Sequence, residues 1–243
     1  MKILAIETSN DICSVSVLED NNLILELKEE TANNHSEALM PLIDKLLKET
    51  SLSLNEIDLF AVDIGPGSFT GIRIGLSTIK AFCDVTNKPC IGISSLEALA
   101  WSIWTVPDNH FQKDCHLTSP LLTCSMIDAK HGNIYSSIFE KNEQGLVKYR
   151  DFSFEKLDDL LLVLSNLKKN IFFVGNCGIL YKDVIQSYLE NNIFFENDSL
   201  ASSKYIGIAA YERFKAGEIQ ISNTLSALYL KKSSAEDSLE ANT

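Results

Sequence analysis

The first hundred residues alternate between short apolar blocks and polar turns, and the apolar blocks have two different periods. Residues 2–7 and 12–18 have the apolar runs and the two-residue alternation of strands, and the polar turn at 8–11 predicts that they form a hairpin. A third strand is predicted over 23–29. Apolar residues then recur at intervals of three and four, which predicts a helix over 35–50.

These periods continue to the end of the first half. The apolar run at 57–64 predicts a buried strand, and the glycine-rich turn after it leads into a predicted helix over 69–86. A strand over 88–93 and a helix over 95–103 complete this half. The predicted order is therefore strand, strand, strand, helix, strand, helix, strand, helix.

A polar segment at 105–120, with Pro107 and Pro120, predicts a loop that divides the chain. The same order of elements returns after this loop. The predicted strands are 121–127, 133–139, 146–150, 171–174 and 193–196, and the predicted helices are 155–165, 179–190 and 203–216. A short echo supports a duplication, because Ile6-Glu7-Thr8 and Ile127-Asp128-Ala129 each end the first strand of a hairpin with an acidic residue.

A duplicated unit of an antiparallel hairpin followed by strand–helix–strand crossovers gives a mixed sheet with helices on both faces. This α/β pattern is that of the actin-like ATPase, sugar kinase and Hsp70 (ribonuclease H-like) fold. We expect an N-terminal subdomain at 1–104, a connecting loop at 105–120 and a C-terminal subdomain at 121–232. The small, polar and acidic tail at 233–243 is expected to be disordered.

Composition and charge narrow the functional classes. The formal net charge is −12, and such an acidic surface repels phosphate backbones, so we expect no strong direct binding of nucleic acid. The chain has no apolar run of about 18 residues and no segment resembling a signal peptide, so we expect a soluble, cytoplasmic protein without membrane contact. Its six cysteines show no regular spacing, which is typical of reduced, structural cysteines.

The most specific stretch is the glycine-rich string from Asp63 to Gly75. A glycine-rich turn that opens a helix is a possible phosphate cradle, because free backbone N–H groups and the positive end of the helix dipole point into it. The alternative is a tight turn whose glycines allow close packing of the helix. The string matches neither common nucleotide-loop motif. Its candidate residues are Gly65, Pro66, Gly67, Ser68, Thr70, Gly71, Arg73 and Gly75.

The fold also predicts where a nucleotide cleft would lie. In this architecture nucleotide binds between the two halves, the hairpin turns meet the phosphates, and a first-strand carboxylate holds metal-bound water. The corresponding residues here are Glu7, Thr8, Ser9, Asp128, Gly175 and Gly178. Glu7 and Asp128 are either paired carboxylates across the cleft or hydrogen-bond partners of their own hairpin turns.

Three possible metal ligands lie together in the predicted loop. His110, Cys115 and His116 match no common zinc spacing, and no fourth ligand is evident. We therefore predict no metal site and no cofactor.

Four segments of the first hundred residues carry a family resemblance. They are Ile3-Leu4-Ala5-Ile6-Glu7-Thr8-Ser9, His35-Ser36-Glu37-Ala38-Leu39-Met40-Pro41, Gly65-Pro66-Gly67-Ser68-Phe69-Thr70-Gly71-Ile72-Arg73-Ile74-Gly75 and Gly92-Ile93-Ser94-Ser95-Leu96-Glu97-Ala98-Leu99-Ala100. In the second half, Ile127-Asp128-Ala129-Lys130 and Leu228-Tyr229-Leu230-Lys231 fit more weakly. Together these segments resemble the TsaB (YeaZ) family of tRNA threonylcarbamoyladenosine biosynthesis proteins.

The resemblance implies a non-catalytic partner of TsaD, the paralogue that transfers the threonylcarbamoyl group to the adenosine beside the anticodon. TsaD-like proteins carry His-x-x-x-His for their metal, and the matching positions here are Ser95 and Leu99. Neither side chain can replace imidazole as a ligand. The adenosine-binding turn of the fold matches Gly175-Asn176-Cys177-Gly178, where bulk at the middle crowds the approach. The resemblance thus implies degenerate metal and nucleotide sites.

In the family the helices at 35–50 and 69–86 pair with their equivalents in a second subunit. The resemblance therefore implies a heterodimer with TsaD, recruitment of the ATPase TsaE to that complex, and a homodimer when the chain is alone. The expected interface residues are His35, Leu39, Leu42, Ile43, Leu46, Ile72, Leu76, Ile79 and Cys83.

The helix at 69–86 also carries a second apolar stripe, formed by Ile74, Ala81, Phe82 and Val85, so it must be covered on two sides. If the stripe of Leu76 faces a partner, Leu76→Glu should give a folded protein that no longer binds. If Leu76 belongs to the monomer's own core, the same change should unfold the chain.

Two rival functions remain open from the sequence. One is an active enzyme of the same superfamily, either an ATP-dependent transferase or a peptidase, against which the missing histidines and the altered adenosine turn argue. The other is a free-standing tRNA-binding module, which the acidic charge disfavours.

Overall fold

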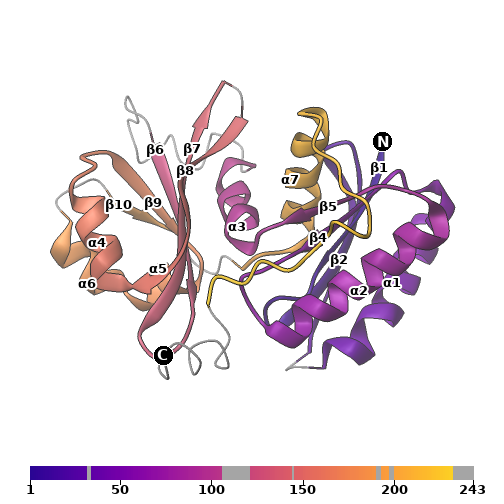
Figure 1. The fold of residues 1–243 in the computed structure, drawn as a ribbon, viewed down its shortest axis with the longest axis horizontal. Helices are drawn as coiled ribbons and strands as arrows, with labels where there is room; N and C mark the ends of the chain where they lie inside the picture. The colour runs from indigo at the N-terminus through magenta and orange to yellow at the C-terminus, as the bar shows by residue number, and fades with distance from the viewer. Residues whose placement is uncertain (32–33, 106–120, 144, 190–192, 197–199, 232–243) are drawn as a thin grey trace, which may run out of the picture.

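The computed structural model describes residues 1–31, 34–105, 121–143, 145–189, 193–196 and 200–231. Figure 1 shows two halves, each built on a twisted sheet. Each sheet has five strands, and the strand orders β3-β2-β1-β4-β5 and β8-β7-β6-β9-β10 are equivalent. In both, the first two hairpin pairings are antiparallel and the next two pairings are parallel. The predicted duplicated α/β fold is therefore confirmed.

The first half follows the predicted order, with one short 3-10 helix that the sequence analysis missed. Its elements are β1 (Lys2–Glu7), β2 (Ile12–Glu19), β3 (Asn22–Glu30), α1 (His35–Thr50), η1 (Leu54–Glu56), β4 (Leu59–Asp63), α2 (Phe69–Thr86), β5 (Cys90–Ile93) and α3 (Ser95–Trp104). Serine caps fix two of the helix starts. Ser68 Oγ accepts a hydrogen bond from the N–H of Gly71, and Ser94 Oγ accepts one from Glu97.

The second half repeats these elements. They are β6 (Leu121–Asp128), β7 (Asn133–Asn142), β8 (Gly145–Lys156), α4 (Leu157–Ser165), β9 (Asn170–Val174), α5 (Asn176–Leu180), α6 (Lys182–Tyr188), β10 (Ile193–Phe195) and α7 (Ser203–Lys215). The prediction of one helix over 179–190 is wrong, because two short helices meet at Tyr181.

The last helix does not belong with the second sheet. α7 packs on β1, β2, β4 and β5 of the first sheet, where Ile206, Ala209 and Ala210 are fully buried. The residues after it, 217–231, form a C-terminal strap (the yellow trace in Figure 1) that runs along the first half, where the N–H of Cys90 is bonded to the carbonyl of Gln220 at 2.9 Å. At its end the strap reaches the second half, where Leu230 packs beside Phe139. The predicted boundary of 121–232 is therefore wrong from Ser203 onward, because the chain crosses back.

The helices α1 and α2 cover one face of the first sheet, and α7 covers the other. The helix α3 packs on α7 and on β6, β7 and β9 of the second sheet. Figure 1 shows α3 lying between the two sheets. Within the described residues, no helix is both long and apolar enough to cross a membrane. The predicted loop at 105–120 beyond Thr105 and the tail at 233–243 lie outside the described residues.

The predicted interface side chains are buried inside the chain itself. No side chain among them is more than 7% exposed. They are the side chains of His35, Leu39, Leu42, Ile43, Leu46, Ile72, Leu76, Ile79 and Cys83. All but His35 belong to one apolar cluster that α1 and α2 form with the first sheet. His35 lies under α2, with its ring Nδ1 3.0 Å from Thr31 Oγ1, and burial lowers its pKa. The expectation that these side chains face a partner is wrong, because each helix uses them to cover its own sheet.

Candidate functional site

The turn of the first hairpin is held by a buried carboxyl group. Glu7 Oε1 accepts hydrogen bonds from both the N–H and the hydroxyl of Ser9, each at 2.6 Å. Its other oxygen accepts a bond from Asn10 Nδ2 at 2.8 Å. Glu7 is fully buried, so it serves its own hairpin turn, as one of the two sequence interpretations expected.

A second buried carboxyl group, Asp63 at the end of β4, joins the same network. Its Oδ2 lies 3.0 Å from Ser9 Oγ, and its Oδ1 accepts bonds from Ser95 Oγ at 2.8 Å and from the N–H of Gly65 at 2.6 Å. Ser95 Oγ also lies 2.9 Å from the carbonyl of Pro66 and 3.2 Å from Ser9 Oγ. Two hydroxyl hydrogens serve two of these five oxygen–oxygen contacts, and a proton on Glu7 or Asp63 would serve one more.

The pKa shifts agree with a shared proton. Burial raises the pKa of Glu7 well above its usual value, and the neighbouring charge of Asp63 raises it further. Burial also raises the pKa of Asp63, to about 6, although four hydrogen bonds oppose the shift. Two carboxyl groups this close do not both ionise easily, so the pair retains a proton near neutral pH.

This pair should make the protein less stable as pH rises from about 4 through about 6. An unfolded carboxyl group loses its proton near pH 4. The folded pair keeps its proton to higher pH, so the folded state binds more protons within this window and loses relative stability across it. Glu7→Gln substitutes an amide that never ionises. Its free energy of unfolding in urea, measured from about pH 4.5 to about pH 8, should therefore decline less than that of the wild type.

Glu56 provides the control of opposite sign. Hydrogen bonds from the N–H and hydroxyl of Ser53 lower the pKa of Glu56, so its stabilising effect is present above about pH 4 and is lost on acidification. Glu56→Gln should thus lose stability relative to the wild type at neutral pH. Parallel curves for the wild type and Glu7→Gln would contradict the shared proton.

The second hairpin turn is built separately. Asp128 accepts bonds from the N–H of Lys130 at 2.9 Å and from its ammonium at 3.0 Å. The N–H of Asp128 donates to Asn176 Oδ1 at 3.0 Å. The possible pairing of Glu7 with Asp128 is therefore wrong, since each carboxylate is used by neighbours on its own side of the cleft.

The glycine-rich turn packs against the first hairpin turn instead of cradling an anion. The N–H of Ser68 donates to the carbonyl of Ser9 at 2.7 Å, and Thr8 Oγ1 donates to the carbonyl of Gly71 at 2.8 Å. A Cβ at Gly67 or Gly75 would come within 2.7 Å of atoms of Ser9 or Thr8. The structure thus supports the tight-turn interpretation. Of the other motif residues, Gly65 and Pro66 are buried, whereas Thr70 and Arg73 are exposed.

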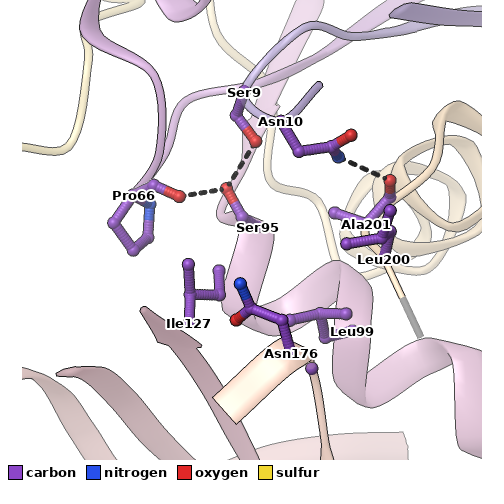
Figure 2. A pocket seen from close by; sticks show the side chains of 10 residues that line it. Ser9, Asn10, Pro66, Ser95, Leu99, Ile127, Asn176, Leu200 and Ala201 are labelled. Carbon is purple, nitrogen blue, oxygen red and sulfur yellow. Dashed lines mark hydrogen bonds between the residues drawn. The ribbon is translucent and has the colours of Figure 1, made fainter. Parts of the chain in front are cut away.

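A small pocket lies at the position of the predicted nucleotide cleft. Figure 2 shows Ser9, Ser95 and Pro66 on one side of this pocket, with Ile127, Leu99 and Asn176 opposite. The pocket has a volume of about 50 Å³. Sites for drug-sized ligands usually have about 300–1,000 Å³. This pocket is therefore smaller than a usual ligand site.

Local contacts fix both sides of this pocket. Asn10 Nδ2 donates to the carbonyl of Ala201 at 3.0 Å (Figure 2). On the other side, Gly175 adopts a φ of 93° and a Cβ there would lie 2.1 Å from the carbonyl oxygen of Met126. Gly178 lies inside α5 and packs on Phe173. These two glycines therefore serve the packing of α5 on β6 and β9.

An uncharged stripe runs along the outward side of α2, beside the exposed charges of Arg73 and Asp84. This uncharged stripe consists of Thr70, Ile74, Ser77, Thr78, Ala81 and Val85. Val85 is 79% exposed, and the other five are exposed or half-buried. The three charged residues of α2, which are Arg73, Lys80 and Asp84, lie off this stripe. The predicted second stripe of α2 is thus the exposed one, apart from Phe82, which is buried.

Sequence reasoning missed two groups at these sites. Asp63 was noted only as the start of the glycine-rich string, although an acidic residue at the end of a buried strand was a usable signal. Tyr229 was noted only as part of a motif, and nothing local indicated that it would contact α2. The possible ligands His110, Cys115 and His116 lie outside the described residues.

Comparison with known proteins identifies the family. The family model described as TsaD, tRNA N6-adenosine threonylcarbamoyltransferase, matches residues 25–237. The tRNA threonylcarbamoyladenosine biosynthesis protein TsaB of Buchnera aphidicola subsp. Baizongia pistaciae is 32% identical over 206 residues, which cover 84% of this chain and 86% of the relative. The chain belongs to the TsaB family. The resemblance inferred from the motifs is therefore confirmed.

Solved structures support the fold assignment of this TsaB-family chain. YeaZ from Pseudomonas aeruginosa superimposes with a TM-score of 0.75 at 20% identity, covering 94% of this chain and 99% of that one. The ROK hexokinase from Thermus thermophilus has a TM-score of 0.52 at 10% identity and covers 89% of this chain. At these identities the likeness concerns the fold alone.

Proposed function

We propose that this chain acts in the biosynthesis of threonylcarbamoyladenosine in tRNA as a non-catalytic scaffold that binds a TsaD-type transferase. Its Buchnera relative is named for this pathway, and membership of the TsaB family supports the same role here. The observation that carries the non-catalytic part is the cleft, whose pocket of about 50 Å³ is lined by Ser95 and Leu99 where TsaD-like proteins have histidines.

The docking surface in this proposal is the outward side of α1 and α2. It consists of the uncharged stripe of α2 together with Met40 of α1, which is 50% exposed. Small side chains such as Ser77 and Ala81 let a second helix approach closely, and apolar contact with Ile74 and Val85 supplies the favourable burial. The docking helices in this proposal are the predicted ones, but their exposed side chains face the partner in place of the predicted buried ones.

The same surface serves the other expected partners. A chain without its partner would pair with a second copy through this stripe, because one surface can be self-complementary about a two-fold axis. TsaE would join the complex with TsaD. Direct tRNA binding by this chain alone is not expected at a net charge of −12.

Ala81→Glu tests the docking surface. Ala81 is exposed, so the variant should fold and melt like the wild type. In a helix–helix contact the new carboxylate would be desolvated without a partner, which costs about 3–5 kcal/mol and weakens association at least a hundredfold. Co-expression of the chain with its own TsaD-type transferase, followed by purification on a tag, should recover the wild-type complex and lose the Ala81→Glu complex.

Gln186→Glu on α6 is the matched control, because it adds the same charge to an exposed helix of the other half. It should leave the complex intact. Recovery of the Ala81→Glu complex at wild-type yield would show that α2 is not the docking helix. Turnover of ATP by the isolated chain, abolished by Glu7→Gln, would instead support the rival enzyme.

A further inference from the structure

An exposed aromatic cluster lies at the start of α2, beside the uncharged stripe. Phe69 and Tyr229 are 53% and 52% exposed, with ring centroids 5.5 Å apart. The guanidinium of Arg73 lies 3.8 Å from the centre of the Phe69 ring, and Arg73 Nε donates to the hydroxyl of Tyr229 at 3.2 Å. The cluster thus joins α2 to a residue 156 positions away in the sequence.

The C-terminal strap holds this cluster in place. The N–H of Leu228 donates to the carbonyl of Ile64 at 2.8 Å, beside Tyr229. Further along α2, Ser222 Oγ donates to Asp84 Oδ1 at 2.6 Å. Arg73 is therefore oriented before any partner arrives, which lowers the entropy lost on binding.

Comparison with the other two arginines of the chain reveals what Arg73 lacks. Arg150 donates hydrogen bonds from two nitrogens to the carboxylate of Glu155, at 2.5 and 2.8 Å. Arg213 donates from Nε and Nη2 to the carboxylate of Glu97. Among the described residues, no carboxylate lies within ion-pairing distance of Arg73. Arg73 is thus an oriented guanidinium at the surface without the planar anion that this group binds best.

We propose that Arg73, positioned by Phe69 and Tyr229, binds a carboxylate side chain of the partner protein that docks on α2. The inference rests on the proposed docking role and adds to it the chemistry of one contact. Arginine flanked by aromatic rings is the composition of binding hot spots, and this cluster borders the uncharged stripe of α2, which suits apolar contact. A partner carboxylate would complete the bidentate pairing seen at Arg150 and Arg213.

The observations favour a carboxylate over a phosphate. A nucleic acid would meet the repulsion of a chain with net charge −12, whereas a protein partner presents a single anion at the edge of an apolar contact. Asp84 also lies on α2 beside the strap, which further disfavours a polyanion.

The test uses the complex of the chain with its TsaD-type transferase and measures Kd by a titration method. Arg73→Lys keeps the charge but loses the planar fork and should weaken binding about tenfold or more. Tyr229→Phe removes only the hydroxyl that orients Arg73 and should weaken it about threefold. Lys182→Ala, which removes an exposed cation over the ring of Phe195, is the matched control and should bind like the wild type. All three variants should melt like the wild type.

The outcomes separate this inference from the proposed function. If the wild type binds, Ala81→Glu does not, and Arg73→Lys binds as tightly as the wild type, the carboxylate contact is wrong while the docking role stands. If the wild type itself fails to bind, the docking role is wrong and this inference is wrong with it. If Arg73→Lys weakens tRNA binding by the complex and leaves the protein–protein Kd unchanged, Arg73 serves a phosphate and the inference is overturned.

Discussion

Leu76→Glu is expected to abolish soluble expression of the folded chain. Leu76 is 7% exposed and packs in the apolar cluster between α2 and the first sheet. The substitution removes about 1.5–3 kcal/mol of apolar burial and adds a carboxylate without a partner, at a cost of several more kcal/mol. The sum is comparable to the whole stability of a typical domain, about 5–15 kcal/mol. Soluble yield and thermal melting by circular dichroism would measure the effect.

The neighbouring stripe of the same helix supplies the control. Ala81→Glu, on the outward side, should remain soluble and melt within a few degrees of the wild type, because its carboxylate stays in water. A Leu76→Glu protein with wild-type yield and melting temperature would mean that Leu76 faces outward. That result would restore the partner-facing interpretation of this side chain.

Gly71→Ala should lower stability although alanine is the better helix former. Helix propensity alone predicts a gain of about 1 kcal/mol for this change inside α2. A Cβ at Gly71, however, would lie 1.9 Å from the carbonyl oxygen of Thr8 and 3.2 Å from the ring of His35. Backbone must move to relieve this contact, so we expect a loss of about 3 kcal/mol or more. For a chain of this size that lowers the melting temperature by about 6–12 °C.

Gly132→Ala provides the comparison. Gly132 has a φ of 75°, and nothing lies within 4 Å of a Cβ built there. Gly132→Ala should therefore lower the free energy of unfolding only by the backbone strain of a positive φ, about 1–2 kcal/mol. Equal melting temperatures for Gly71→Ala and the wild type would show that α2 does not press on the first hairpin turn.

Local periodicity was enough to locate most elements. The predicted helices at 35–50 and 69–86 have the bounds of α1 and α2, and the predicted order of strands reappears in both sheets. These features depend on the spacing of apolar residues over one or two turns and on capping residues such as Ser68. Both are properties of neighbouring residues, so a single sequence contains them.

Local periodicity could not show which side of α2 faces the sheet. Its two apolar stripes looked alike in the sequence, and only the sheet decides which one is buried. Gly71 and Gly75 were the available signal, because they lie on the side that approaches Thr8 at close range. The inner stripe of Ile72 and Leu76 follows from that contact, and the outer stripe with Ala81 is left for a partner.

By itself, the sequence determined the duplicated α/β fold, the TsaB family and the loss of histidines at Ser95 and Leu99. Only the tertiary structure decided the meeting of Glu7 and Asp63 at Ser9, the return of α7 to the first sheet, and the contact of Arg73 with Tyr229. The reason is the range of the forces involved. Period and capping act between residues a few positions apart, whereas burial, proton sharing and ring contacts depend on which distant segments the folded chain brings within a few ångströms.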